Sequence, residues 1–337
     1  MSTKPRASHS PEDLRAVKIT SSTPIDAGPI DLSSRTFDPH LPELLRTWSS
    51  YATNIISINC YPNGLTYTIH ETEKAADEIS AEHIFTPSQF HLRLPETREM
   101  FLPAGRMSML KDDALIELER RLHTLKEQGT LNQSVIYLGL INDPFLPLHR
   151  KFAVTMGVLD LLERYAPQLL VIQTRSPMVI SALPTLKMLR EQAIVAMHLE
   201  SPLENVVQRY TPGQPRISER LLAVDGLRCQ GVKINLVVSP ILPYGDVHRD
   251  AWKFAEILNQ HADYITFGCL AVGTSFTDQQ LRNLPVSKKL IADKNLRTLR
   301  PHAYRHVFNA LKQVAPEKLL LPIKPPTCPA QLKLFAA

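Results

Sequence analysis

The sequence has little glycine and little cysteine, and this scarcity excludes several common classes of protein. Only 12 of the 337 residues are glycine, and none of the motifs G-x-x-x-x-G-K-[ST], G-x-G-x-x-G or G-x-S-x-G occurs. The phosphate loops of NTPases, dinucleotide-binding turns and the nucleophile elbows of hydrolases depend on those glycines. The four cysteines, Cys60, Cys229, Cys269 and Cys328, are scattered and do not form the pattern of a disulfide framework.

Long apolar runs are also missing. No stretch approaches the roughly 18 uninterrupted apolar residues that a membrane-spanning helix needs. The polar start of the chain (1–15) has no apolar core of a secretory signal. We therefore expect a cytoplasmic protein without membrane association. Hydrophobic residues still make up 44% of the chain, enough for a sizeable core, and the net charge of +5 permits an anionic partner without requiring one.

Short apolar runs that alternate with amphipathic segments predict one α/β domain between two tails. Residues 1–40 are polar and without period, which predicts a disordered tail. Residues 41–315 predict the folded domain, beginning with an amphipathic helix from Leu41. Residues 316–337 are rich in proline and predict an extended tether. The expected strands are 54–60, 134–141, 168–173, 193–198, 232–238 and 263–269, and the expected helices are 112–128, 148–165, 177–190, 216–230, 247–261 and 301–315.

Six consecutive strand–helix units predict a parallel sheet buried on both faces. Right-handed crossovers leave two arrangements, an open doubly wound sheet or a curved partial barrel. In both, ligands bind at the carboxyl ends of the strands. The candidate site residues therefore directly follow the expected strands: 59–61, 142–144, 174–176, 198–200, 239–240 and 268–269.

Three segments of this region resemble the spore photoproduct lyase-like branch of the radical S-adenosylmethionine (SAM) proteins. Residues 135–147, VIYLGLINDPFLP, are similar to a strand that ends in a T-D-P-Y-x-P turn. Residues 171–176, VIQTRS, are similar to an I-x-T-[KR]-S strand end. Residues 217–243, ISERLLAVDGLRCQGVKINLVVSPILP, are similar to a helix with the pattern R-L-x-A that precedes a strand ending in P-[IV]-[IL]-P. The similarity runs in consistent order from about residue 50 to about residue 275.

This resemblance implies a partial (β/α)6 barrel of radical SAM type, with SAM at its mouth. Arg175 matches the basic position that meets the SAM carboxylate in that family, and Thr174 and Ser176 flank it with hydroxyls. Asn142 and Asp143 match the turn that lines the cofactor site, and His198 follows the fourth strand near cofactor and substrate. An alternative is that Asp143 only begins a turn and that Arg175 only caps a strand end.

The chain departs from the family at the cluster loop. There the family has a C-x3-C-x2-C motif whose thiolates ligate a [4Fe–4S] cluster. Cys60 stands at the first of these positions, but Gly64 and Tyr67 stand at the second and third. Cys269 ends the last expected strand and could face the same mouth as Cys60. A rebuilt cluster would use Cys60 and Cys269 as metal ligands; the alternative is that both are small buried hydrophobes.

The end of the chain carries a second short signal. Gln331, Leu332, Leu334 and Phe335 form a Q-L-x-L-F sequence, which resembles the peptide that docks bacterial polymerases and repair factors on the DNA sliding clamp (beta subunit). Two leucines and a phenylalanine can fill an apolar pocket while the glutamine forms hydrogen bonds, and a tether raises the local concentration. The alternative is a strand that folds back on the barrel.

One basic segment has no counterpart in these motifs. His302 and His306 are four residues apart on an expected helix, with Arg305 between them, which favours a solvated or phosphate-facing basic helix over a metal site. His70 and Glu71 do not continue into the H-E-x-x-H pattern of zinc proteases.

Together these features predict a DNA repair or replication-associated protein. It is built on a diverged radical SAM barrel without the usual cluster cysteines, so that it is a pseudoenzyme, and it is delivered to DNA by its tail. The alternatives are an active radical SAM lyase-like enzyme with a non-standard iron–sulfur site and a non-enzymatic adaptor.

Overall fold

A computed structural model describes residues 54–61, 64–71, 106–110, 114–139, 143–145, 148–268, 282, 284–300 and 302–320. The expected helix from Leu41, the tail 1–40 and the clamp-like peptide lie outside these residues, as do Asn142 and Cys269. Within the described part, no helix is long and apolar enough to cross a membrane.

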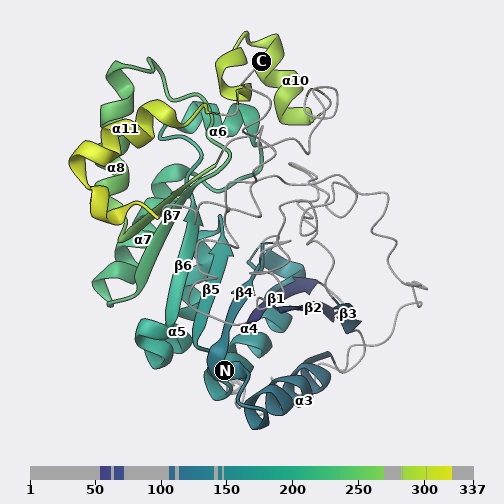
Figure 1. Ribbon diagram of the computed structural model, residues 1–337. Helices are drawn as coiled ribbons and strands as arrows, with labels where there is room; N and C mark the ends of the chain where they lie inside the picture. Colours follow the sequence, from purple (N-terminus) through teal and green to yellow (C-terminus); the bar gives the residue numbers. More distant parts are fainter. Residues whose placement is uncertain are drawn as a thin grey trace, which may run out of the picture.

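The core of the fold is one eight-stranded sheet with the order β3-β2-β1-β4-β5-β6-β7-β8 (Figure 1). The six strands β1 and β4 to β8 are parallel, and β2 and β3 extend the β1 edge in antiparallel fashion. The strands are β1 Asn54–Tyr61, β2 Gly64–Glu71, β3 Arg106–Leu110, β4 Ser134–Leu138, β5 Leu169–Thr174, β6 Ala193–His198, β7 Lys233–Val238 and β8 Tyr264–Phe267.

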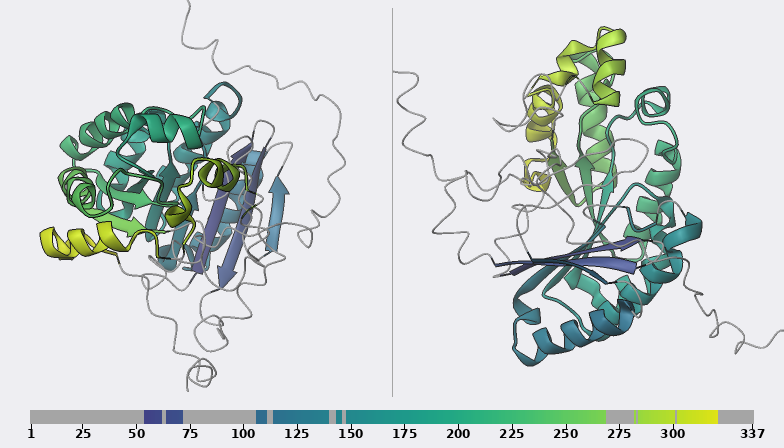
Figure 2. Two further views of the ribbon diagram at one scale, coloured as in Figure 1. Left: turned by 90° about the horizontal axis from the view of Figure 1, so that it is seen from above. Right: turned by 90° about the vertical axis from the view of Figure 1, so that its right-hand side faces the viewer.

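The helices between the strands all cover one face of the sheet (Figure 2). They are α3 Ala114–Glu127, α4 Leu148–Arg164, α5 Leu183–Leu189, α7 Ile217–Cys229, α8 Arg249–His261 and, after β8, α11 Arg305–Val314. All six contribute to a single hydrophobic core with the strand residues that point toward them. The parallel strands follow one another without a reversal of order, so right-handed crossovers place every helix on the same side. This topology confirms the α/β prediction. Because the helices cover one face only, the arrangement is the partial barrel and not the doubly wound sheet.

The boundaries follow from local chemistry. Helix α7 ends in a Schellman motif, in which the N–H of Gly231 donates to Arg228 and that of Val232 to Leu227. Gly231 has φ +82°, which explains why glycine stands there. Strand β4 ends at Leu138, three residues earlier than expected, and is followed by Gly139, whose φ is +89°. A Cβ at Gly139 would lie 2.6 Å from the carbonyl oxygen of Gln173, so only glycine fits.

Residues 60–67, expected to form the loop that follows the first strand, are instead part of a hairpin. Cys60 pairs with Leu65 and Tyr61 with Gly64 across β1 and β2. The prediction of a cluster loop was wrong at this position, because the alternating sequence GLTYTIHE is a strand sequence that pairs directly with β1. Strand β3 was also not expected.

The carboxyl-terminal part of the domain extends further than expected. A 3₁₀ turn, Pro316–Lys318, and Leu319 pack against the β8 edge, where the N–H of Leu320 donates to Ile265. The domain therefore includes residues 316–320, which the sequence assigned to the tether. Two short helices, α6 Glu204–Tyr210 and α10 Pro285–Ala292, form a smaller apolar cluster of their own with Leu242.

Candidate functional site

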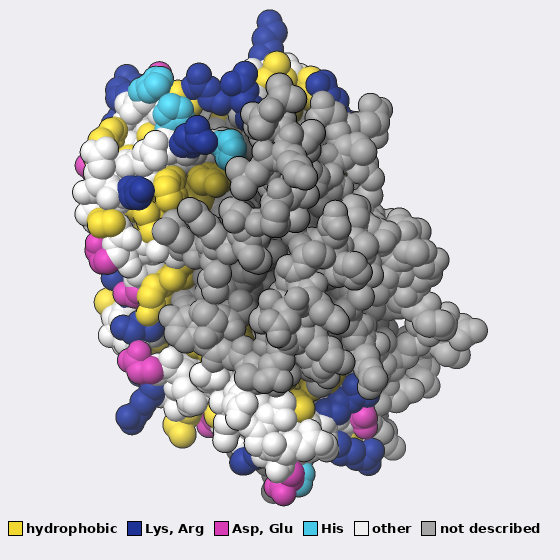
Figure 3. Space-filling model, in the orientation of Figure 1, with side chains coloured by type: hydrophobic (Ala, Val, Ile, Leu, Met, Phe, Trp, Pro, Cys, Tyr) yellow, Lys and Arg dark blue, Asp and Glu magenta, His cyan; other side chains and the backbone are white. Residues whose placement is uncertain are grey.

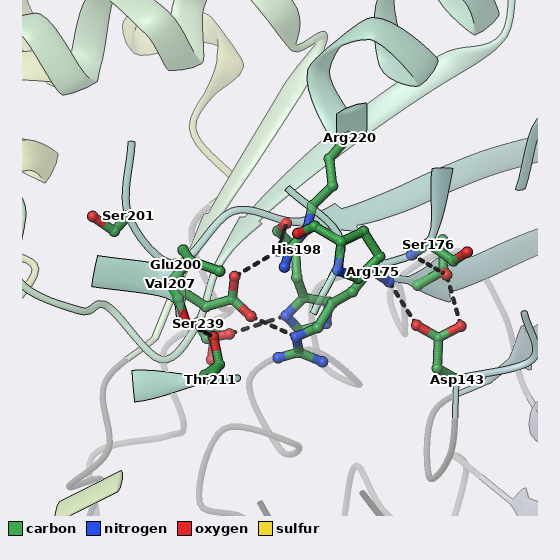
Figure 4. A network of polar contacts seen from close by, with 12 residues as sticks. Asp143, Arg175, Ser176, His198, Glu200, Ser201, Val207, Thr211, Arg220 and Ser239 are labelled. Atoms are coloured by element: carbon green, nitrogen blue, oxygen red, sulfur yellow. Dashed lines mark hydrogen bonds and ion pairs between the residues drawn. The ribbon is translucent and has the colours of Figure 1, made fainter. Parts of the chain in front are cut away.

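A charged cluster lies at the carboxyl ends of β4 to β6 (Figure 4). Its members are Asp143, Thr174, Arg175, Glu200 and Arg220, and we call it the mouth network. Asp143 follows β4, Thr174 ends β5, Arg175 follows it, Glu200 follows β6, and Arg220 comes from α7. All five are nearly or completely buried. Because buried charges are costly unless paired and hydrogen-bonded, their partners decide what the site can do.

Asp143 ties the end of β4 to the end of β5. One carboxylate oxygen accepts hydrogen bonds from Thr174 Oγ1 at 2.7 Å and from the N–H of Phe145 at 3.0 Å. The other oxygen accepts from the N–H of Arg175 at 2.7 Å. Ser176 caps the next turn by accepting from the N–H of Met178. Asp143 and the two hydroxyl groups thus organise the backbone that carries Arg175.

Glu200 lies between two arginines. Its Oε2 accepts from Arg220 Nη1 at 2.8 Å, and its Oε1 accepts from Arg175 Nε. Burial alone would raise the pKa of Glu200, but the charges of Arg175 and Arg220 outweigh it and hold the pKa well below its usual range. Glu200 is therefore an anion in the folded chain, and it fixes both guanidinium groups.

Arg220 and Arg175 differ in how many of their guanidinium nitrogens donate hydrogen bonds to other described residues. Arg220 is fully buried and also donates to the carbonyl oxygens of His198 and Pro215. Its Nη2 has no hydrogen-bond partner among the described residues. Arg175 uses only Nε for Glu200, so its two terminal nitrogens make no hydrogen bond within the described part of the chain. The Arg175 side chain is 11% exposed, so these donors are available for an anionic ligand.

His198 is held neutral beside this network. Its Nδ1 lies 3.0 Å from the carbonyl oxygen of Ser239, which can only accept, so Nδ1 carries the proton. Its Nε2 then accepts from the Gln173 amide at 2.8 Å. Burial, with the charge of Arg175, lowers the pKa of His198 to about 3. The ring is a fixed hydrogen-bonding group at neutral pH.

The sheet face away from the helices is unusually polar. Along β1, Ile56 and Ile58 belong to the hydrophobic core, whereas Ser57 and Asn59 alternate with them and point the other way. The same alternation places further buried polar side chains on this face: Tyr137, Gln173, His198, Asn235 and Thr266. Several bond to one another, as Thr266 does to Asn235. Parallel strands buried on both faces are normally apolar, so this row indicates a ligand-facing surface.

The residues at the expected cluster positions do not fit an iron–sulfur cluster. Cys60 is fully buried in the hydrophobic core with Ile56 and Ile58, on the helix side of β1. Gly64 offers no ligand, and burial raises the pKa of the Tyr67 hydroxyl, which disfavours the phenolate. Among the described residues, no group of three His, Cys, Asp or Glu side chains is placed to hold a metal.

The structure thus joins Asp143, Thr174, Arg175, Ser176 and His198 at one edge of the sheet, as their positions after the strands predict. The sequence did not identify Gln173 or Arg220. Arg220 had a signal: it occupies an apolar position of α7, three residues after Ile217 and four before Val224, both of which are buried. An arginine in such a stripe requires a buried acidic partner. Glu200 was noted only as a polar residue after a strand.

The structure is that of an α/β protein with a buried charged cluster, the mouth network, at the carboxyl ends of parallel strands. Among solved structures, the chain is similar to spore photoproduct lyase. One match is a cysteine-to-serine mutant (14% identity, TM-score 0.42, 62% of this chain and 65% of that chain), and another is a double mutant with bound AdoMet and dinucleoside spore photoproduct (14%, 0.42, 63% and 66%). Native anSMEcpe with bound AdoMet is a further match (11%, 0.35, 61% and 52%).

These similarities concern part of each protein. The chain spans less than two thirds of the length of the spore photoproduct lyase structures. No protein-family model matches the sequence, and no curated protein matches it.

Proposed function

We propose that this chain is a DNA repair or replication-associated protein built on a diverged radical SAM-type barrel, whose mouth binds SAM without an iron–sulfur cluster. The observation that carries the proposal is the Arg175 side chain, which Glu200 anchors through Nε and whose two terminal nitrogens form no hydrogen bond with another described residue. A fork of two N–H donors matches a carboxylate in geometry and charge. Arg175 is also the position at which the sequence resembles the carboxylate-binding residue of the family.

The chain's own residues prepare this site for the SAM carboxylate. Asp143 fixes the backbone of Arg175, and Glu200 fixes its guanidinium, so little side-chain entropy remains to be lost on binding. Gln173 and neutral His198 lie next to it on the polar face. SAM, when bound, would supply a sulfonium-activated methionine and an adenosine group. Because the residues present do not fit the cluster, no radical step is assigned.

Titration calorimetry with SAM tests this proposal on the chain purified without iron reconstitution. Wild-type protein is expected to bind SAM, and Arg175→Ala to bind about tenfold or more weakly, because a charge-assisted hydrogen bond contributes about 1.5–3 kcal/mol. Arg228→Ala is the matched control, since Arg228 lies on α7 and pairs with Asp263.

Two results would overturn it. If wild-type protein does not bind SAM, the mouth is not a SAM site, and the non-enzymatic adaptor becomes the better account. If Arg175→Ala and Arg228→Ala bind SAM equally well, Arg175 does not hold the ligand.

The DNA association is supported by the tail sequence. Gln331, Leu332, Leu334 and Phe335 resemble a sliding-clamp peptide at the end of a segment rich in proline. A contact of this kind is weak by itself and acts through the local concentration that the tether provides. On this proposal, the clamp delivers the barrel to DNA.

A further inference from the structure

The first turns of α8 and α11 lie side by side at the β8 end of the fold. His248, directly before α8, and His306, in the first turn of α11, have ring centroids 4.9 Å apart. The two helices enclose a surface pocket of about 170 Å³, lined by Val247, His248, Ala251, Trp252, His306, Asn309, Ala310 and Gln313. Trp252 is 43% exposed. Two helix N-termini so close together concentrate positive partial charge.

The chain that leads into α11 is strongly basic. Residues 294–316 contain five Lys or Arg residues and no Asp or Glu. Successive backbone turns connect Arg297, Arg300 and Arg305: the N–H of Arg300 donates to Arg297, that of Ala303 to Arg300, and that of Arg305 to His302. All three arginines are exposed. None of them forms an ion pair with another residue of the described ranges.

The acidic residues nearby are already engaged. Asp250 pairs with Arg249 and Lys253. Asp246 accepts from the N–H groups of His248 and Arg249 at the start of α8. Neither carboxylate neutralises Arg297 or Arg305, so the surface keeps a net positive charge.

His306 directly follows Arg305, and its ring lies edge to face with that of His248. Burial, together with the positive charges of His248, Arg297 and Arg305, lowers its pKa. Figure 3 shows Lys, Arg and His side chains gathered at this end of the molecule. The sequence predicted His302 on a helix, but α11 begins at Arg305, so His302 lies in the turn before it.

We propose that His248, Arg297, Arg305 and His306 form a phosphate-binding surface that holds the backbone of DNA outside the barrel mouth. Two guanidinium groups that form no ion pair within the described part of the chain, beside two helix N-termini, match a row of phosphates in charge and in hydrogen-bond donors. The exposed Trp252 gives the pocket a flat apolar wall against which a sugar or a base can pack. This inference rests on the DNA association proposed above, but it concerns a surface separate from the mouth and from the tail.

Fluorescence anisotropy with a labelled 30-base-pair DNA duplex tests the surface. We compare the full chain with Arg297→Ala/Arg305→Ala over a series of salt concentrations. The double variant is expected to bind about tenfold more weakly, and the slope of log K against log salt is expected to fall by about 2, since each phosphate contact contributes about 0.9. Arg297→Lys/Arg305→Lys keeps the charge and is expected to retain most of the slope.

Arg120→Ala/Arg164→Ala is the matched control, because it removes two exposed arginines from α3 and α4, which lie at the β1 end of the sheet, away from α8 and α11 (Figure 1). It is expected to leave both affinity and slope unchanged. Equal effects of the two alanine pairs, or no effect of Arg297→Ala/Arg305→Ala, would overturn the surface while leaving the proposed DNA association intact. Failure of the wild-type chain to bind DNA would also overturn the surface, whereas the association through the clamp is tested separately by binding to the purified sliding clamp. SAM binding by the same variants is expected to stay normal.

Discussion

The buried charge of Glu200 gives the most quantitative prediction. Glu200→Gln keeps the shape of the side chain but leaves Arg175 and the fully buried Arg220 without their shared anion. Breaking a buried ion pair by removing one partner costs about 3–5 kcal/mol, because a buried charge is left uncompensated. For a domain of this size, we expect a fall in Tm of about 10 °C. Urea unfolding followed by circular dichroism at pH 7.5 measures the loss directly.

The control is Glu119→Gln, which breaks the exposed pair between Glu119 and Arg164 and is expected to cost at most about 1 kcal/mol. Adding Arg220→Met to Glu200→Gln removes the uncompensated cation, so the double variant is expected to recover at least about 1 kcal/mol. If Glu200→Gln unfolded at the same urea concentration as Glu119→Gln, the mouth network would not be a buried charge cluster.

Two further predictions concern pH and the tail. Because the pKa of His198 is about 3 when folded and about 6.5 when unfolded, the unfolded chain binds more protons between these values, and stability falls as pH drops through this window. From pH 7.5 to pH 5 the loss from this group is about 2 kcal/mol; urea titrations of His198→Gln should lack it, and an equal pH dependence in the variant would contradict the assignment. Leu334→Ala/Phe335→Ala should abolish binding to the purified sliding clamp in surface plasmon resonance, and unchanged binding would refute the docking proposal.

The parallel part of the fold could be predicted because its signals are local. Strand 193–198 has the expected bounds, and the α7 end at Gly231 follows from a glycine that must adopt positive φ. The hairpin of β1 and β2 was missed for a different reason. Its alternating residues indicate a strand, but the resemblance of Cys60 to a cluster ligand led to the prediction of a loop.

The position of the candidate site could be predicted from the sequence, but the hydrogen bonds and ion pairs within it could not. Strand ends in parallel sheets lie along one edge, so Thr174, Arg175 and His198 could be placed together from sequence. The contact between Glu200 and Arg220 joins residues 20 apart through a loop and a helix, and no periodicity encodes such a pairing. The sequence placed Arg305 and His306 on a solvated or phosphate-facing basic helix, but it could not add His248, which reaches His306 only through the packing of α8 on α11.

The central claim is a SAM-type barrel without its cluster, and iron analysis tests it most directly. Iron and acid-labile sulfide are measured per chain after anaerobic purification and reconstitution, for wild-type protein and for Cys60→Ala. Cys60 lies in the hydrophobic core, so both proteins are expected to contain iron and sulfide at background level. About four iron and four sulfide per chain in the wild type, lost in Cys60→Ala, would contradict the account and establish an active cluster site.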